Sequence, residues 1–373
     1  MNSPSPLPLV AQALSAAGVT MLAQLLSDDK EAQVVALDAA PVRVADPLER
    51  HERLRLAWAG PKGEGNHLLL LKVLSALTWS EAVNLTIPAP VEVLFVESDL
   101  ATVLDDIVAN HVVAAARRNE TRPAWLLYHD LQTLLKDNDR DTQRLVLEKT
   151  ATFHALHWGA TAVLDDVYPW LPRFAQGVQA HLAFLAAIVE GEPTLDLPYE
   201  RWALQRWPTL PTDFRAFWQH LAPVHSNPLR TLFQDPTPLL ERLAHSPQTL
   251  LHGAWRRETL LRHEERLLSH TWGFLQIGPA AWDLCTYLGD CLYDGSHSLS
   301  RSEAIALYLD QVATIITELS DTDRLLFEQS YDLCWLLNVL LHPQRYPALF
   351  APMSPDGTEK RRTDLLQIIE RLL

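Results

Sequence analysis

The sequence predicts an α+β protein with two lobes, a small mixed α/β lobe followed by a larger, mainly helical lobe. Its 373 residues exceed what one ordinary hydrophobic core accommodates, so two lobes are expected. Short and alternating apolar runs, typical of strands, are gathered before residue 131, whereas apolar residues at helical spacing dominate from residue 132 onward. Hydrophobic residues form 48% of the chain, which favours packed lobes over disorder.

The first 29 residues are expected to form an arm and one helix ahead of the small lobe. Residues 1–9 are rich in Pro and Ser, and residues 10–29 carry apolar side chains at helical spacing. The small lobe then spans residues 30–131. A turn is expected over Pro61–Asn66. The first three strands of the lobe are expected over Gln33–Val44, His51–Gly60 and His67–Leu74.

The rest of the small lobe is expected to contain one helix and two strands. The pattern around VEVLFVESDL predicts a single helix over Pro90–Val108. The strands are expected over Val112–Arg117 and Trp125–Leu131, joined by a loop at Asn119–Pro123.

The large lobe, residues 132–373, is expected to be mostly helical. Thr142–Trp158 has the spacing of an amphipathic helix. Residues 250–290 follow the order loop, strand, tight turn, strand, loop and helix. Terminal helices with apolar faces are expected over Ser302–Leu319, Thr322–Leu341 and Arg361–Leu373.

Charge and cysteine usage narrow the classes of partner and compartment. The net charge of −15 disfavours nucleic acid and anionic membranes, because both require a basic face. We therefore expect a small molecule or a protein as partner. Three cysteines without a C-x-x-C pair suit a reduced cytosol. The N-terminal stretch lacks the positive start of a secretory signal, and no apolar run has spanning length, so a cytoplasmic protein is expected.

Residues 250–290 carry the densest motif in the chain. His252-Gly253 opens the stretch, a charged turn follows at Arg262–Arg266, and a Gly-Pro break precedes the helical run Ala280–Leu288. This arrangement resembles the catalytic segment of the aminoglycoside phosphotransferase and choline-kinase-like family, small-molecule kinases with a protein-kinase-like fold. The residues that lie on the family's frame are His252, Gly253, Trp272, Gly278, Pro279, Trp282, Asp283 and Leu284.

The resemblance implies a two-lobe protein-kinase-like fold and ATP or another nucleotide as cofactor. It gives Lys72 the role of the strand lysine that contacts the phosphates and pairs with a helix glutamate. Glu92 is the preferred partner and Glu97 the second. The alternative is a strand-edge lysine that points to solvent. Both interpretations of Lys72 stay open from the sequence.

The segment Leu126–Asp130 is similar to the family's linker between the lobes, where the nucleotide base bonds to backbone groups. The resemblance places Tyr128 and His129 at this cofactor contact. Because backbone donors tolerate a change of side chain, a purine could dock here. The alternative is an ordinary connection between the lobes.

The residues that perform the chemistry in the family are absent here. The catalytic-base aspartate is replaced by Ala254, the metal-binding asparagine by Thr259 and the metal-binding aspartate by Thr271, although His252 is retained. Threonine hydroxyls are poor substitutes for anionic oxygen ligands, so magnesium and any other metal are not expected. The loop expected to cradle phosphate, residues 44–52, has no glycine and several acids.

Three functions remain from the sequence. The leading hypothesis is a catalytically impaired pseudokinase that binds a ligand or a protein partner. The first alternative is an active ATP-dependent small-molecule phosphotransferase with displaced acids such as Glu258 or Glu264, and the second is a scaffold with a collapsed pocket. The polar residues near the missing site are Glu258, His263, Glu264, Glu265 and His270, which also suit a solvated hairpin tip.

Two further features are interpreted as structural. Asp283 aligns with a family aspartate that braces the catalytic loop. His154 and His157 lie on one helix face at i, i+3 spacing, but the sequence places no third metal ligand beside them, so core histidines are favoured.

Overall fold

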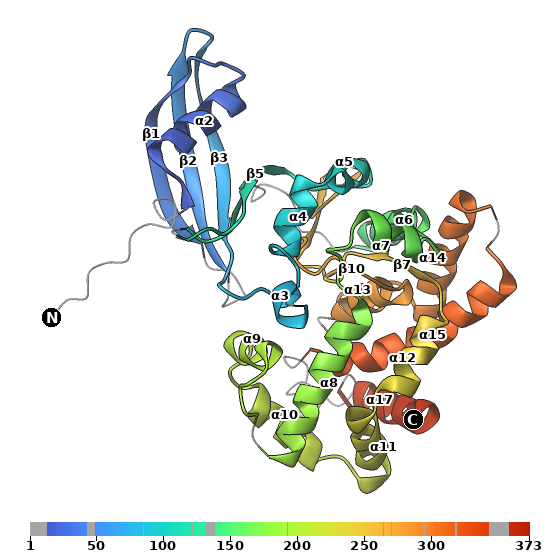
Figure 1. The fold of residues 1–373 in the computed structure, drawn as a ribbon. Coiled ribbons are helices and arrows are strands. Elements are labelled where there is room, and N and C mark those ends of the chain that lie inside the picture. Colours follow the sequence, from blue (N-terminus) through green and yellow to red (C-terminus); the bar gives the residue numbers. More distant parts are fainter. Residues whose placement is uncertain are drawn as a thin grey trace.

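Figure 1 shows a sheet-containing small lobe set apart from a helical large lobe. The computed structural model describes residues 13–42, 49–84, 86–120, 122–130, 139–191, 193–263, 265–269, 271–293, 295–317, 319–342 and 358–373. The predicted two-lobe α+β architecture is confirmed. The predicted boundary between the lobes, at residues 131 and 132, lies outside the described residues and stays a prediction. None of the helices that the described ranges contain is long and apolar enough to cross a membrane.

The small lobe is built on a five-stranded antiparallel sheet. The strand order is β1 (Gln33–Val42), β2 (Arg50–Gly60), β3 (Gly63–Val73), β6 (Trp125–His129) and β5 (Val112–Ala116). Helix α2 (Ala16–Ser27) lies along the first strands in Figure 1 and places Leu22 and Ala23 in one core with apolar residues of β2 and β3. Residues 43–48, which include residues 44–48 of the predicted phosphate loop, lie outside the described residues.

The turn between β2 and β3 is tighter than predicted. Gly60 pairs with Gly63 across the hairpin, so only Pro61 and Lys62 form the turn. The sequence prediction extended the turn to Asn66 because it counted the glycines as turn residues. Gly63 instead occupies the first position of β3 with a φ of 134°, a value that glycine adopts without strain.

The predicted helix over Pro90–Val108 is wrong as a single element. The structure has α4 (Val91–Glu97) and α5 (Asp99–Asp105), with Ser98 between them in an extended conformation. The Ser98 hydroxyl and its N–H both donate to Phe95 O, which ends α4. Ser98 is also the N-cap residue of α5, followed at once by an acidic residue, and this is a recognised start signal.

The large lobe is mainly helical, as predicted. Its core is continuous with the buried faces of α4 and α5. Helix α3 (Trp79–Val83) lies between the sheet and the large lobe in Figure 1 and contacts α8 and α9. The helices of the large lobe are α6 (Arg140–Ala155), α7 (Thr161–Val167), α8 (Phe174–Glu190), α9 (Pro198–Arg206), α10 (Leu210–Gln219), α11 (Pro223–Gln234), α12 (Thr237–Ala244), α13 (Ala281–Tyr293), α14 (Arg301–Ile315), α15 (Asp321–Leu340) and α17 (Thr358–Leu372).

Short strands of the large lobe hold the motif-bearing segment. Strands β7 (Gln248–Leu251) and β10 (Gln276–Pro279) pair antiparallel, and β8 (Leu260–His263) forms a hairpin with β9 (Arg266–Ser269). Strand β4 (Val108–Ala109) pairs with β9 in parallel and so ties the end of α5 to this hairpin. Between β9 and β10, Trp272 donates its N–H to Glu92 of α4 and so contacts the small lobe.

Candidate functional site

Lys72 is buried at the centre of the face between the lobes. Strand β3 presents it next to α4, and its side chain is 1% exposed. The Lys72 Nζ lies 2.8 Å from Glu92 Oε2 and 3.0 Å from Glu92 Oε1. The expected pairing of Lys72 with Glu92 is therefore present, and the alternative of a solvent-pointing lysine is wrong. Glu97, the second choice, instead pairs with Arg117 on the surface, with 2.6 Å between Oε2 and the guanidinium.

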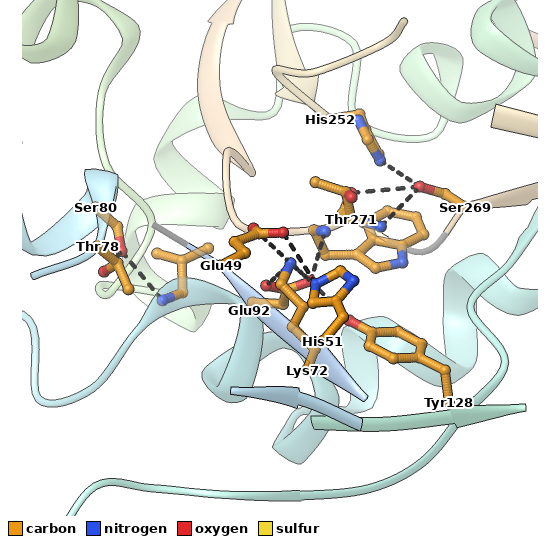
Figure 2. A network of polar contacts seen from close by, with 12 residues as sticks. Glu49, His51, Lys72, Thr78, Ser80, Glu92, Tyr128, His252, Ser269 and Thr271 are labelled. Atoms are coloured by element: carbon orange, nitrogen blue, oxygen red, sulfur yellow. Dashed lines mark hydrogen bonds and ion pairs between the residues drawn. The ribbon is translucent and has the colours of Figure 1, made fainter. Parts of the chain in front are cut away.

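A second carboxylate, which the sequence interpretation missed, also holds Lys72. Glu49 Oε1 lies 2.9 Å from Lys72 Nζ, and Glu49 Oε2 lies 3.2 Å from His51 Nε2 (Figure 2). The signal that could have located Glu49 is the hairpin register. His51, the second residue of β2, is the cross-strand partner of Lys72. Glu49 immediately precedes β2 and therefore lies beside the lysine. One of the acids noted in residues 44–52, Glu49, thus forms an ion pair with Lys72.

The electrostatics of this cluster are those of a tightly held ion pair. Burial alone would lower the pKa of the Lys72 ammonium, but the charges of Glu49 and Glu92 outweigh burial and keep that pKa above its ordinary value. Burial acts to raise the pKa of the Glu49 carboxyl, and Lys72 and His51 more than reverse that effect, so the pKa lies well below its ordinary value. Both groups are therefore charged at neutral pH.

Glu92 also joins the small lobe to the motif-bearing segment. Its Oε1 accepts a hydrogen bond from the Tyr128 hydroxyl at 2.7 Å (Figure 2). The same oxygen accepts from the Trp272 N–H at 3.1 Å. Burial, together with the charge of Glu92, raises the pKa of the Tyr128 phenol well above its ordinary value. The oxygens of Glu92 are thus committed to three donors on three segments of the chain.

The backbone predicted to hold a purine base is already bonded within the protein. The His129 N–H donates to His111 O at 3.1 Å, and the Asp130 N–H donates to Leu68 O at 3.0 Å. The Tyr128 side chain is buried, whereas that of His129 is exposed. A base at this linker would have to displace existing hydrogen bonds or use residues 131–138, which lie outside the described residues.

Asp283, at the start of α13, braces the His252 segment. Its Oδ2 accepts from His252 N at 2.8 Å, and its Oδ1 accepts from Gly253 N at 2.9 Å. His154 Nε2 lies 3.2 Å from Asp283 Oδ2, and His154 Nδ1 lies 2.7 Å from the Tyr308 hydroxyl. His154 is thus a core histidine with a partner at each ring nitrogen. These contacts agree with the structural roles expected for His154 and Asp283.

A short polar chain lies in the segment that the resemblance marks as catalytic. His252 Nε2 is 2.8 Å from Ser269 Oγ, which in turn lies 3.3 Å from Thr271 O (Figure 2). Burial lowers the pKa of His252 to about 4, and the charge of Asp283 offsets only part of that effect. His252 is therefore neutral at physiological pH.

The three replaced positions supply no anionic oxygen. Ala254 is a buried methyl group, and its carbonyl accepts from the Thr259 hydroxyl at 2.6 Å. Thr271 participates through its backbone, because its N–H and its carbonyl both contact Ser269 Oγ. The described ranges contain no group of three or more His, Cys, Asp or Glu side chains that could hold a metal ion.

The polar residues that could have formed a substitute site lie in solvent where they are described. The Glu258 side chain is 66% exposed and 3.7 Å from Arg256, and the Glu265 side chain is 87% exposed and 3.6 Å from Arg262. The positions of Glu264 and His270, and the side chain of His263, lie outside what the structure describes. The structure therefore does not bring Glu258 or Glu265 to the Lys72 cluster.

A cleft opens beside this cluster, between the lobes, with about 420 Å³ of empty space that includes open solvent. Glu49 and Glu92 line it from the small lobe, and Gly273 and Phe274 line it from the segment after Thr271. The acids lie on its wall because they hold Lys72. The cleft therefore presents carboxylate oxygens at the position where the family resemblance implies a phosphate.

Comparisons with known proteins identify the fold. No protein-family model and no curated protein matches the sequence. Ethanolamine kinase from Plasmodium vivax has a TM-score of 0.51 at 11% identity, over 89% of this chain and 81% of that chain. Choline kinase LicA from Streptococcus pneumoniae has a TM-score of 0.45 at 11% identity, over 91% and 94%. The GDP complex of aminoglycoside 2′-phosphotransferase-IIIa has a TM-score of 0.40 at 13% identity, over 96% and 100%.

The first of these comparisons confirms the two-lobe protein-kinase-like fold that the sequence predicts. The strand order of the small lobe, with the lysine strand β3 at the centre of the sheet and Glu92 on the adjoining helix, is consistent with that fold. At 11% identity the likeness concerns the fold and not the activity.

Proposed function

We propose that this chain is a kinase-fold protein that does not perform metal-dependent phosphoryl transfer, a pseudokinase that binds a small molecule or a protein partner. One observation carries the proposal. The positions that would supply the base and the metal ligands, Ala254, Thr259 and Thr271, contain no carboxylate, while the lysine of the fold is already neutralised by two acids.

Magnesium does not fit the residues present. Magnesium binds hard, anionic oxygen ligands, usually carboxylates together with substrate phosphates. Here Ala254 offers no side-chain oxygen, and the Thr259 hydroxyl already donates to the Ala254 carbonyl. The loss of a general base alone costs about 10²–10⁴ in rate. The proposal therefore includes no step through a metal.

The charge of the Lys72 cluster supports weak binding of nucleotide at most. One ammonium beside two carboxylates gives the cluster a net negative charge, which repels a polyphosphate. A phosphate that approached Lys72 would have to displace Glu49, whose side chain is 21% exposed at the edge of the cleft. ATP or another nucleotide stays a candidate ligand on the condition that Glu49 moves.

A phosphoryl-transfer assay tests the proposal against the alternative of an active phosphotransferase with displaced acids. The assay uses a panel of hydroxyl and amine acceptors, with ATP or GTP and with or without magnesium. We expect turnover no higher than that of Lys72→Ala with every acceptor. Magnesium-dependent turnover that Glu258→Gln abolishes would support the alternative, and any magnesium-dependent turnover lost in Lys72→Ala would overturn the proposal.

A further inference from the structure

Helix α2 is apolar on the face that it turns to solvent as well as on the face that it packs. Its inner face places Leu22 and Ala23 in a core with apolar residues of β2 and β3. Its outer face exposes Met21 and Leu25, which are 68% and 62% exposed. A helix on a protein surface normally has polar side chains on its outer face, and a helix that is apolar all round is normally covered. Within the described residues, the outer face of α2 is left uncovered.

The exposed apolar residues of α2 form a single row, which we call the α2 stripe. It consists of Ala17, Met21 and Leu25, which are exposed at intervals of four residues and therefore lie one above the other. At 1.5 Å of rise per residue the row is about 12 Å long. Its N-terminal end is small, because Gly18 follows Ala17, and its C-terminal end is large. None of the three residues lines the cleft, and α2 stands clear of the large lobe in Figure 1.

The sequence around the α2 stripe has no charged side chain. No Asp, Glu, Lys or Arg occurs from Met1 to Ser27, although charged residues make up 21% of the chain. Two copies of a chain with a net charge of −15 repel each other over most of their surfaces. Two α2 helices can approach each other without that repulsion, whereas a basic partner is drawn to the acidic surface elsewhere. The charge distribution therefore favours a second copy of the chain as the occupant of the stripe.

We propose that α2 is a self-association surface, on which a second copy of this chain packs its own α2 in the antiparallel orientation. A two-fold axis beside Met21 places Met21 against Met21, and Ala17 of each copy against Leu25 of the other. The small end of each stripe thus receives the large end of the other, as the packing of side chains between helices requires. A parallel pair would crowd two leucines at one end and leave a gap between two alanines at the other.

The residues at the two ends of α2 also suit the antiparallel pair. Asp28, the C-cap residue of α2, has a fully exposed side chain that pairs with Lys62 at 3.2 Å. In the antiparallel pair this carboxylate lies near Ser15 of the second copy, where that copy's α2 begins. The N–H groups at a helix N-terminus favour a carboxylate beside them. A parallel pair would instead place Asp28 beside Asp28.

Sedimentation velocity of the full chain measures the self-association, without nucleotide or acceptor, so the result is independent of the proposed function. Small contacts give weak complexes, so the wild type is compared over about 1–200 µM. We expect a dimer at the upper end of this range. Met21→Glu is expected to weaken the dimer at least about tenfold, because it places two carboxylates together at the two-fold axis. Leu325→Glu is the matched control, since Leu325 on α15 is 55% exposed outside the stripe, and it is expected to leave the dimer unchanged.

Cysteine cross-linking with copper phenanthroline as oxidant tests the orientation of the two helices. Met21→Cys is expected to form a covalent dimer, because the two-fold axis brings the two sulfurs together. Leu25→Cys alone is not expected to cross-link, since its two copies lie about 12 Å apart along the helix axis. A mixture of Ala17→Cys and Leu25→Cys is expected to cross-link, because these positions face each other. Circular dichroism checks that each variant is folded. The native cysteines are all buried and do not compete, namely Cys285, Cys291 and Cys334.

Three results would overturn the inference. They are a wild type that stays monomeric over the whole range, a dimer that is unchanged in Met21→Glu, and cross-linking of Leu25→Cys as readily as of Met21→Cys.

A membrane is the other surface that an exposed apolar helix can meet. Co-sedimentation with vesicles of phosphatidylcholine and phosphatidylglycerol is therefore measured in parallel. We expect no binding of the wild type to these vesicles. A monomer that binds them, and that loses this binding in Met21→Glu, would assign the α2 stripe to a membrane and overturn the pairing of two copies.

Discussion

At the scale of single residues, the burial of Lys72 has a large energetic consequence. Its ammonium is almost fully removed from water and depends on Glu49 and Glu92 for compensation. A buried ion pair contributes little net stability, but the removal of one partner leaves uncompensated charge in the interior. Lys72 therefore has a structural role, whether or not it takes part in catalysis.

Lys72→Ala is expected to lower the free energy of unfolding by about 3–5 kcal/mol, because it leaves two carboxylates facing each other in the interior. Urea unfolding followed by circular dichroism measures the change. Lys62→Ala is the matched control. Lys62 forms a surface pair with Asp28 at 3.2 Å and has a 59% exposed side chain, so about 1 kcal/mol or less is expected. Equal losses of stability in the two variants would contradict the claim that Lys72 compensates two carboxylates in the interior.

His181 provides a second prediction, on the pH dependence of stability. Its Nε2 lies 3.1 Å from Leu340 O and must donate, so its Nδ1 accepts from the Tyr199 hydroxyl at 2.7 Å. Burial lowers the pKa of His181 to about 4. The unfolded chain binds a proton near pH 6.5, so the stabilising contribution of the neutral ring is complete above that pH and is lost as the pH falls toward 4.

The expected size of the His181 effect is roughly 3 kcal/mol between pH 6.5 and pH 4, from about 1.4 kcal/mol for each unit of pKa difference. Urea unfolding over this range measures it. His181→Gln is expected to be less stable at pH 7 and to have a shallower loss of stability as the pH falls. A variant as steep as the wild type would rule out His181 as a source of the slope.

Single residues were predictable from the sequence only where a motif marks them. Lys72 and Glu92 come together as the resemblance implies, because strand β3 and helix α4 lie side by side at this point. Glu49 was missed because its contact depends on the register of a hairpin, and no local spacing encodes that register. Arg206, which lines the cleft, was missed for a similar reason. It reaches the rings of Trp202, Trp207 and Phe274 only through tertiary packing.

At the scale of elements, the N-terminus of α13 organises the segment after β7. Asp283 accepts hydrogen bonds from two consecutive backbone N–H groups and contacts His154 on α6. Gly253 is needed at this position, since its φ is 77° and an added Cβ would lie 2.0 Å from Phe274 O. Helix α13 thus holds the backbone of His252 and Gly253 through Asp283.

Asp283→Ala is expected to destabilise the chain by about 3–5 kcal/mol, because two backbone N–H groups and His154 lose their buried acceptor. Urea unfolding measures the loss, and amide hydrogen exchange at His252 and Gly253 reports whether this segment opens. Asp310→Ala is the control. Asp310 is 74% exposed and pairs with Arg324 at 3.4 Å, so about 1 kcal/mol or less is expected. A similar loss of stability in both variants would contradict the claim that Asp283 holds the backbone of His252 and Gly253 in place.

The elements were predicted well where apolar periodicity is long and poorly where a cap interrupts it. Thr142–Trp158 corresponds to α6 within a few residues, because its apolar face continues over four turns. Pro90–Val108 failed as a single helix because Ser98 ends one helix and starts the next while the apolar spacing runs on. The two-residue turn at Pro61-Lys62 was obscured by the glycines that follow it.

At the scale of the whole molecule, the two lobes contribute different groups to one cleft. Glu49 and Glu92 line it beside Lys72 from the small lobe, and Arg206 lines it from α9 of the large lobe. The net charge of −15 gave no indication of this arrangement, because composition averages over the surface. The fold was predictable from the order of elements, but the position of Arg206 at the cleft depends on the packing of α9 against α3 and α8.

The central claim is that Glu49 and Glu92 hold Lys72 in the position where a nucleotide phosphate would have to contact it. Thermal unfolding with ATP, ADP and GTP, with and without magnesium, tests it most directly. A ligand at a hundred times its dissociation constant adds about 2.7 kcal/mol to stability, which a melting curve resolves. Wild type, Glu49→Gln and Lys72→Ala are compared, each relative to its own melt without nucleotide.

We expect magnesium to add nothing to any nucleotide-induced shift of the wild type. We also expect Glu49→Gln to increase the shift, because it removes one negative charge beside Lys72. A magnesium-dependent shift in the wild type that disappears in Lys72→Ala would contradict the account, since it would mean that the protein assembles a metal-nucleotide site at this lysine.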